Sequence, residues 1–249
     1  LFFNLIALHH DYPGRYTYNS MENNITLNSR DSGYRGIWYF NQPSGDEFAY
    51  KYSGGLGTYC AKHRPIAIYR PEVDKTFFCY GGCDTDAHLK YTTDELADGH
   101  AFERSRPGML KHMIGFYDHA HHSVPRPTVL LDKGTADAHD NPVMAIDDQG
   151  YIWVFSTSHG ASRPSYIHKS ARPYSIDEFE LVPAEWDGGQ GIEKISNFSY
   201  MQPWFVPGRG FIAFLTRYHN PVVRTIGYIT SGDGFLWSAW KPLAIMSEG

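Results

Sequence analysis

The sequence predicts an all-β fold built from repeated four-stranded sheets. Three observations support this prediction: β-branched and aromatic runs bounded by Gly and Pro recur along the chain, one stretch repeats another, and helical periodicity is almost absent. The composition agrees, because 16% of the 249 residues are aromatic and 24 Gly and 15 Pro supply turns. With 42% hydrophobic and 20% charged residues, the chain can bury a core, which excludes intrinsic disorder.

The expected strands follow one another along most of the chain. The longest segment without a strand signal is 84–108, which is polar and irregular, so we expect a long loop there with one short helix near 93–97. The runs that predict strands lie at 34–40, 66–69, 76–80, 112–117, 129–131, 143–146, 151–155, 166–168, 211–215, 225–229 and 235–240.

An internal repeat organises these strands into larger units. The segments 141–146, 150–156 and 166–170 match 202–206, 210–216 and 227–231 at an offset of 60 to 61 residues, and 64–69, 75–80 and 112–118 form a looser copy. Strand, turn, strand, loop and further strands is the order of a β-propeller blade, and isolated blades cannot bury both faces. Three or four blades are countable, whereas closed propellers typically have four to eight. We therefore expect an incomplete β-propeller.

The turn from Ser231 to Trp237 resembles the Asp-box of BNR-type propellers, although it is one residue shorter. In this interpretation Asp233 caps its own turn and Trp237 fills the space between blades.

Charge and hydropathy bear on partners and location. The net charge of −5 argues against a nucleic-acid binder, and no run of 18 apolar residues could span a membrane. The apolar residues 1–8 resemble the end of a secretion signal, with a short strand as the alternative. We divide the chain into an N-terminal segment, 1–31, and a propeller catalytic domain, 32–249. We expect a monomer that is secreted, periplasmic or at the cell surface.

The three cysteines, Cys60, Cys79 and Cys83, favour buried thiols over a metal site, because no second Cys/His pair with suitable spacing follows. A structural Zn or Ca site that includes His219 stays open. No cofactor is required for the chemistry described below.

Four polar side chains occupy matched places in two blades. His139 precedes the first strand of one blade and His159 follows its second strand, while Tyr200 and Arg217 hold the corresponding places one repeat later. Loops of this kind line one mouth of a propeller. Histidine and tyrosine can exchange protons, and the guanidinium fork of arginine suits a carboxylate. These residues are the candidate catalytic group.

The chain resembles bacterial ulvan lyases, which are BNR-repeat polysaccharide lyases on seven-bladed propellers. The resemblance runs from about residue 32 to the end of the chain and is carried by the segments 34–38, 52–59, 124–128, 137–142 and 153–160. It implies β-elimination in ulvan, a sulfated algal polysaccharide, next to a uronic acid, which leaves 4,5-unsaturated oligosaccharides. His139 and Tyr200 match the proton-transfer residues of the family, Arg217 the residue that neutralises the uronate, and His159 a second active-site histidine.

A polyanionic substrate requires a locally basic groove in this acidic protein. The further residues that we expect to bind substrate are Asn141, Arg126, Arg163, Tyr218 and His219. Two alternatives stay open: a glycoside hydrolase on the same fold, whose sialidase-type arginine triad we do not find, and a non-catalytic propeller that binds sulfated polysaccharide.

Overall fold

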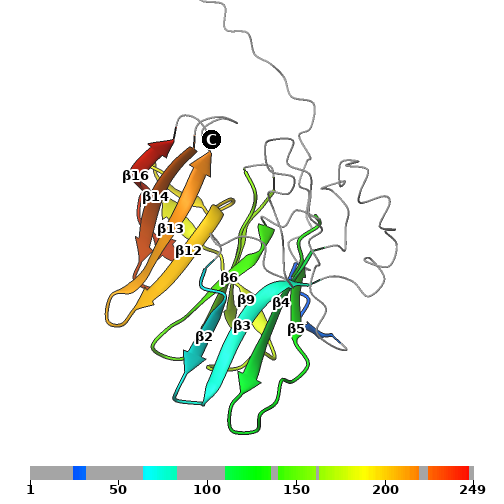
Figure 1. Ribbon diagram of the computed structural model, residues 1–249. Helices are drawn as coiled ribbons and strands as arrows, with labels where there is room; N and C mark the ends of the chain where they lie inside the picture. The colour runs from blue at the N-terminus through cyan, green and yellow to red at the C-terminus, as the bar shows by residue number, and fades with distance from the viewer. Residues whose placement is uncertain are drawn as a thin grey trace, which may run out of the picture.

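The computed structural model describes residues 25–31, 64–82, 110–135, 140–160, 163–218 and 224–246. Within these ranges the chain forms sixteen β-strands in four sheets and no α-helix (Figure 1), which confirms the all-β prediction. In the described part of the chain, no helix is long and apolar enough to cross a lipid bilayer. The strand expected at 34–40 and the loop with a short helix at 84–108 lie outside the described residues.

The first sheet has five strands in the order β1-β5-β4-β3-β2. Side chains alternate between its two faces, so Phe77 and Cys79 pack toward the second sheet while Phe78 and Tyr80 pack with Met113 on the other face. The strands are β1 (Ser29–Arg30), β2 (Ala67–Arg70), β3 (Lys75–Gly82), β4 (Lys111–Asp118) and β5 (Thr128–Asp132).

The second sheet has four strands in sequence order. Every residue of its first two strands is buried, which explains why both read as continuous apolar runs: each face of the sheet is covered by a neighbouring sheet. The strands are β6 (Pro142–Ile146), β7 (Ile152–Ser156), β8 (Tyr166–Ser170) and β9 (Phe179–Leu181).

The third large sheet repeats this plan in the order β12-β13-β14-β16. Its first three strands occupy the places of β6, β7 and β8, which confirms the predicted repeat. Its strands are β12 (Ser199–Val206), β13 (Gly210–Tyr218), β14 (Arg224–Ser231) and β16 (Lys241–Met246). A small sheet in the order β11-β10-β15, with β10 parallel to β15, contains β10 (Glu185–Asp187), β11 (Ile192–Lys194) and β15 (Leu236–Trp237).

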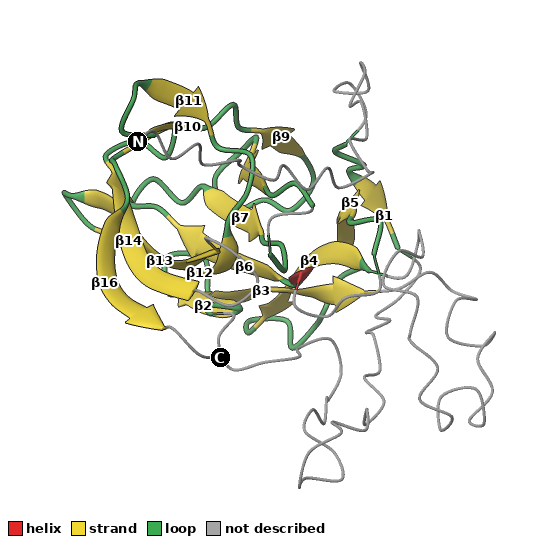
Figure 2. Ribbon diagram, turned by 90° about the horizontal axis from the view of Figure 1, so that it is seen from above, coloured by secondary structure: helices red, strands yellow, loops and turns green. Residues whose placement is uncertain are grey.

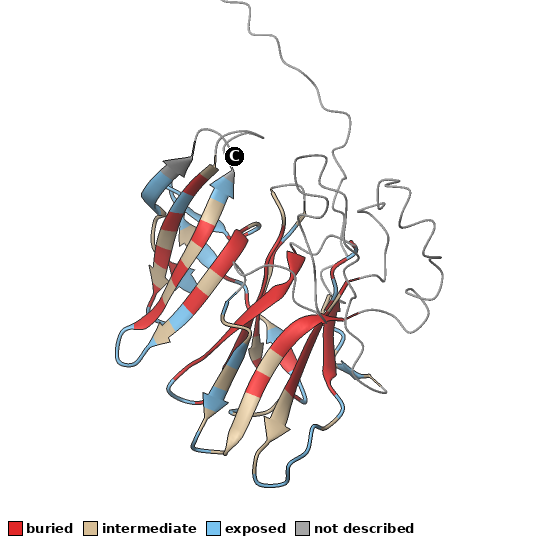
Figure 3. Cartoon of the chain, viewed as in Figure 1, coloured by how far each residue is buried: buried red, intermediate tan, exposed pale blue. Residues whose placement is uncertain are grey.

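The three large sheets are arranged as blades of a propeller. One edge strand of each sheet, namely β2, β6 and β12, lines a common cavity of about 620 Å³. The view from above shows these three strands together, with the opposite edge strands β1, β9 and β16 further out (Figure 2). Two apolar cores fill the spaces between sheets, one between the first and second large sheets and one between the second and third. Figure 3 shows most buried residues along the strands, whereas exposed residues lie at the turns and also within β2 and β12.

The roles expected for Asp233 and Trp237 in the turn 231–237 are confirmed. The Asp233 carboxylate accepts the backbone N–H groups of Phe235 and Leu236 at 2.8 and 3.0 Å. Burial alone would raise the pKa of Asp233, but these hydrogen bonds outweigh it and lower the pKa. The ring of Trp237, 1% exposed, lies 6.0 Å from that of Phe155 on β7 and 5.8 Å from that of Phe211 on β13. Trp237 therefore joins two blades.

The structure changes two sequence-based expectations: where the first sheet begins, and how long the strand at 235–240 is. β1 lies within the predicted N-terminal segment 1–31, yet it pairs with β5, and the Leu27 N–H also donates to the Leu130 carbonyl at 2.8 Å. The sheet therefore begins before residue 32. The strand expected at 235–240 is reduced to β15, because the hydrogen bonds of the Asp-box hold the chain in a turn until Leu236.

Candidate active site at one edge of the sheets

The candidate site lies where β5 and β7 end and where β6 and β12 begin. Antiparallel pairing places Pro142 of β6 opposite Ser156 of β7, so both loops emerge at one edge. The loop after β7 is tied to the start of β12: the Ser158 N–H donates to the Phe198 carbonyl at 3.0 Å, and the Ser199 hydroxyl donates to the Ser158 carbonyl. Neighbouring blades are thus joined at the predicted residues.

Tyr200 and His159 meet at this edge, where the repeat predicts polar side chains from two neighbouring blades. Their ring centroids lie 6.1 Å apart, with the planes inclined by 64°. Tyr200 is 8% exposed and has φ of +49°, a left-handed conformation that is unusual for a bulky residue. The register of β12 against β13 shifts at this point, between Ser199 and Gln202. Such bulges re-aim side chains next to active sites, and a strained conformation costs about 1–3 kcal/mol.

Asp140, the residue after His139, anchors both loops of the site. Its side chain is fully buried, and it accepts the backbone N–H of His159 at 2.6 Å. Both carboxylate oxygens accept the Arg163 guanidinium, from Nε at 2.7 Å and from a terminal nitrogen at 2.9 Å. This bidentate geometry is the strongest form of ion pair that arginine makes. Asp140 therefore fixes the position of the His159 backbone.

The side chain of His112 holds the backbone of Asp140 through a hydrogen bond. The ring is fully buried, and its Nε2 lies 2.6 Å from the Asp140 carbonyl, while Nδ1 lies 2.8 Å from the Ser156 hydroxyl. Since a carbonyl can only accept, Nε2 carries the proton. The backbone and the side chain of Asp140 are thus both held.

Lys133, just after β5, stabilises the other side of the His159 loop. Its buried ammonium group donates to the Ser158 hydroxyl at 2.8 Å and to the Pro164 carbonyl. Burial lowers the pKa of Lys133 to about 7; nearby Arg163 lowers it further, whereas Asp140 opposes the shift. Lys133 is therefore a buried amine that loses its proton near neutral pH.

Arg217 is exposed at the end of β13. Its guanidinium carbon lies 5.3 Å from the ring centroid of Trp186 on β10 and 5.7 Å from that of Trp240. Two indole faces therefore hold the cation while it stays open to solvent. The guanidinium of Arg217 is thus held in place and accessible from solvent.

The other residues that the sequence predicts for the site do not all lie beside Tyr200 and His159. Arg163 reaches the site but forms the ion pair with Asp140. Asn141 is 3% exposed, and its amide oxygen occupies the space that a Cβ on Gly81 would need. Asn141 thus packs in the interior. Tyr218 is the last residue of β13, whereas His139 and His219 lie outside the described residues.

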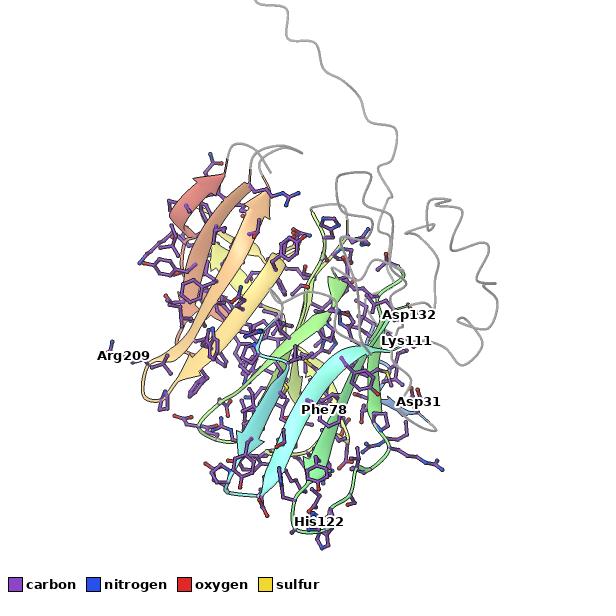
Figure 4. The ribbon with its side chains drawn as sticks, in the orientation of Figure 1. Asp31, Phe78, Lys111, His122, Asp132 and Arg209 are labelled. Atoms are coloured by element: carbon purple, nitrogen blue, oxygen red, sulfur yellow. The ribbon has the colours of Figure 1, made fainter. Side chains whose placement is uncertain are left out.

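Arg126 is placed away from the group. It precedes β5, whereas Lys133 follows β5, seven residues later. At about 3.3 Å per residue the two ends are about 20 Å apart. Figure 4 shows this separation, with His122 of the β4–β5 connection at one end of the sheet and Lys111 and Asp132 at the other.

A metal site stays a prediction. Cys79 is buried, its thiol 3.6 Å from the Pro142 carbonyl, and burial raises its pKa, as expected for a thiol in an apolar interior. Among the described residues no group of three or more His, Cys, Asp or Glu side chains is suited to a metal ion. Cys60, Cys83 and His219 lie outside the described residues.

Sequence reasoning missed Asp140, Lys133 and the two tryptophans around Arg217. Asp140 could have been found, since it follows His139 directly in the segment 137–142. Lys133 and Trp186 carry no sequence signal, because only the packing of separate sheets shows what they contact.

No protein-family model matches the sequence, and no curated protein matches it. Several solved structures are similar, and two of them are ulvan lyase structures. One is described as the structure of a new family of polysaccharide lyase, PL25 ulvan lyase; it has 18% identity and a TM-score of 0.50, over 84% of this chain and 42% of that chain. The chain has the fold of ulvan lyase.

The second structure is the ulvan lyase bound to -[GlcA(1-4)Rha3S]-, with 17% identity and a TM-score of 0.50 over the same shares of the two chains. The present chain therefore spans less than half the length of these ulvan lyase structures. At this identity the likeness establishes the fold, and the chemistry has to be argued from the side chains described above.

Proposed function

We propose that this chain is part of a polysaccharide lyase that cleaves ulvan by β-elimination next to its uronic acid. The observation that carries the proposal is Tyr200: a bulky residue in a left-handed conformation, at a bulge, edge-on to His159. Strain at one position is retained where it serves a function. The ulvan lyase fold supports the substrate class, since one of the similar structures holds a disaccharide of glucuronic acid and sulfated rhamnose.

The reaction requires three groups. A base removes the weakly acidic C5 proton of the uronate, the C5–H electron pair becomes the C4–C5 double bond, and the C4–O4 bond breaks as O4 accepts a proton. Tyr200 and His139 share these proton transfers. Negative charge develops on the uronate carboxylate before O4 leaves, and a preorganised cation there lowers the barrier. Arg217, with His159, supplies this stabilisation.

The surroundings of Arg217 suit this role. Trp186 and Trp240 fix its guanidinium from the sides without neutralising its charge, so the fork is available to a carboxylate. Asp140 and Lys133 hold the loop of His159 from both sides. A polymer of this kind is met outside the cell, and we include secretion or surface display in the proposal.

The decisive experiment is the Tyr200→Phe variant assayed on ulvan by the ultraviolet absorbance of the unsaturated product. Removal of the phenolic proton should lower kcat by about a hundredfold or more, the scale of general acid–base catalysis. Tyr228→Phe on β14 is the matched control and should leave kcat unchanged. Near wild-type turnover by Tyr200→Phe would refute the role of Tyr200.

The nature of the product tests the proposal against its alternatives. New reducing ends without the double bond would identify a hydrolase, and binding without cleavage would identify a non-catalytic propeller. Arg217→Lys keeps the charge but loses the fork, so it should retain more activity than Arg217→Ala while remaining clearly impaired. Equal activities of these two variants would contradict carboxylate recognition by the fork.

A further inference from the structure

A second feature with the character of a binding site lies at the opposite edge of the sheets. A cavity of about 610 Å³, here called the distal cavity, separates the turn between β8 and β9 from the ends of β1, β3 and β5. Its charged lining consists of Arg30, Lys75, Arg126, Arg172 and Asp177. Arg126, which the sequence predicts to bind substrate, lines this cavity.

The distal cavity has a strong excess of positive charge. Asp177 pairs with Arg30 and, at 3.0 Å, with Arg172, and the Arg30 guanidinium also donates to the Arg126 carbonyl at 2.9 Å. Lys75 and Arg126 are left to face the cavity without a carboxylate from its lining. Lys75 has Asp118 as its cross-strand neighbour, outside the lining, and among the described residues Arg126 has no ion-pair partner. Such a concentration of cations is unusual in a protein of net charge −5.

The uncharged part of the lining suits a sugar ring. Phe116 forms part of the wall, with the Lys75 ammonium 4.4 Å from its ring centroid. Tyr174 also lines the cavity, and its ring stacks on that of Phe77 with the centroids 6.3 Å apart. Aromatic faces combined with a few placed charges are the usual composition of a ligand site. Asp177 bridges Arg30 and Arg172 across this lining.

We propose that the distal cavity binds a sulfated stretch of an acidic polysaccharide, as a second contact remote from the candidate active site. The choice of a sulfated polysaccharide rests on the proposed function, whereas anion binding follows from the cavity itself. Lys75 and Arg126 contact the sulfate esters, and the aromatic wall contacts the sugar. Because about 20 Å separates the two edges, this contact retains polymer near the enzyme and leaves the chemical step unchanged.

The test compares the whole chain with a Lys75→Gln/Arg126→Gln double variant. Both substitutions leave the Arg30–Asp177–Arg172 network and the Arg126 carbonyl in place, so the fold should persist, which a thermal melt verifies. The matched control is Arg209→Gln/Lys241→Gln, which removes two exposed cations from the third large sheet. Figure 4 places Arg209 on the far side of the molecule from Asp31 and the first sheet.

Binding of ulvan is measured by titration calorimetry at low salt. The double variant should bind about fivefold more weakly than wild type, since exposed charge contacts are each worth only a few-fold, and the control should bind like wild type. The difference should disappear at high salt, where screening removes it. On polymer the double variant should show a raised KM, while kcat on a short oligosaccharide stays the same.

The remaining outcomes overturn the proposal. Equal affinity of the double variant and the control would exclude the distal cavity as a site. If inorganic sulfate displaces ulvan at the same concentration of charge, the cavity binds only a free anion. If desulfated ulvan binds as tightly as native ulvan, the cavity does not recognise sulfate. Equal binding of a DNA oligonucleotide would mean a general polyanion surface. Since binding needs no turnover, failure of the lyase proposal would show separately, as absence of unsaturated product.

Discussion

Replacement of Asp140 by Asn tests whether a buried ion pair holds the candidate site together. The substitution keeps the shape of the side chain and an oxygen that can accept the His159 N–H. In the wild-type chain the His159 nitrogen lies 2.6 Å from the Asp140 carboxylate oxygen. It removes the negative charge, and it turns an NH₂ group toward the Arg163 guanidinium, which can only donate. The His159 N–H contact therefore survives in principle, whereas the ion pair does not.

The expected cost follows from burial. Asp140 has no exposed side-chain surface and that of Arg163 is 23% exposed, so the guanidinium would lose its partner in a largely water-excluded place. Removing one partner of a buried pair costs about 3–5 kcal/mol. We expect the free energy of unfolding to fall by about 3 kcal/mol, since Arg163 retains some solvent. We also expect kcat to fall by about tenfold or more, because the His159 loop moves.

Urea unfolding measures the first effect and product formation the second. Asp177→Asn is the matched control: it also loses bonds to two arginines, but its side chain is 55% exposed, so we expect a loss below about 1 kcal/mol. An Asp140→Asn/Arg163→Gln double variant should be more stable than the sum of the two single effects predicts. If Asp140→Asn unfolds like Asp177→Asn, the anchoring role of Asp140 is wrong.

Three further variants test neighbouring parts of the structure. Between pH 7 and 10.5 the unfolded chain binds a proton that the folded Lys133 releases, so stability should rise with pH by up to about 1.4 kcal/mol per unit. Lys133→Met should lack this rise in urea titrations, and identical slopes would contradict a depressed pKa. Trp237→Ala should lower the free energy of unfolding by about 3–5 kcal/mol, since it empties the space between two blades; a loss below about 1 kcal/mol would contradict this. Trp186→Ala should lower kcat by releasing Arg217, and it should cost less stability than Trp237→Ala because Trp186 is only partly buried; unchanged kcat would show that the indole does not position the guanidinium.

The strands that the sequence predicts are those whose apolar residues face a core. β6 and β7 are fully buried and read as continuous apolar runs, so they were located closely. β10 and β11 escaped prediction because their residues are mostly charged. β10 is a strand through its pairing with β11 and β15 rather than through its own propensity. A pattern of side chains cannot show such pairings.

The candidate site was predictable to the extent that the repeat determines position. The repeat puts His159 after the second strand of one blade and Tyr200 at the start of the next blade, and their rings lie 6.1 Å apart. The place of Arg126 depends on strand direction: β5 runs toward the candidate site, so a residue before β5 lies at the opposite edge. The partners of Asp140 come from residues up to 28 positions away, and only folding brings them together.

The two edges of the molecule differ in the number of positive charges that stay available to a ligand. At the candidate active site, Asp140 neutralises Arg163, and burial removes the proton of Lys133 near neutral pH. Arg217 keeps an exposed charge there, held by two indole faces. A single oriented cation can stabilise charge that develops on one carboxylate, but it attracts a long polyanion weakly. The distal cavity, by contrast, combines several cations with an aromatic wall. If both proposals hold, polymer binding and activation of the uronate take place at separate edges, and the effects of Lys75→Gln/Arg126→Gln and Arg217→Ala on kcat/KM should add.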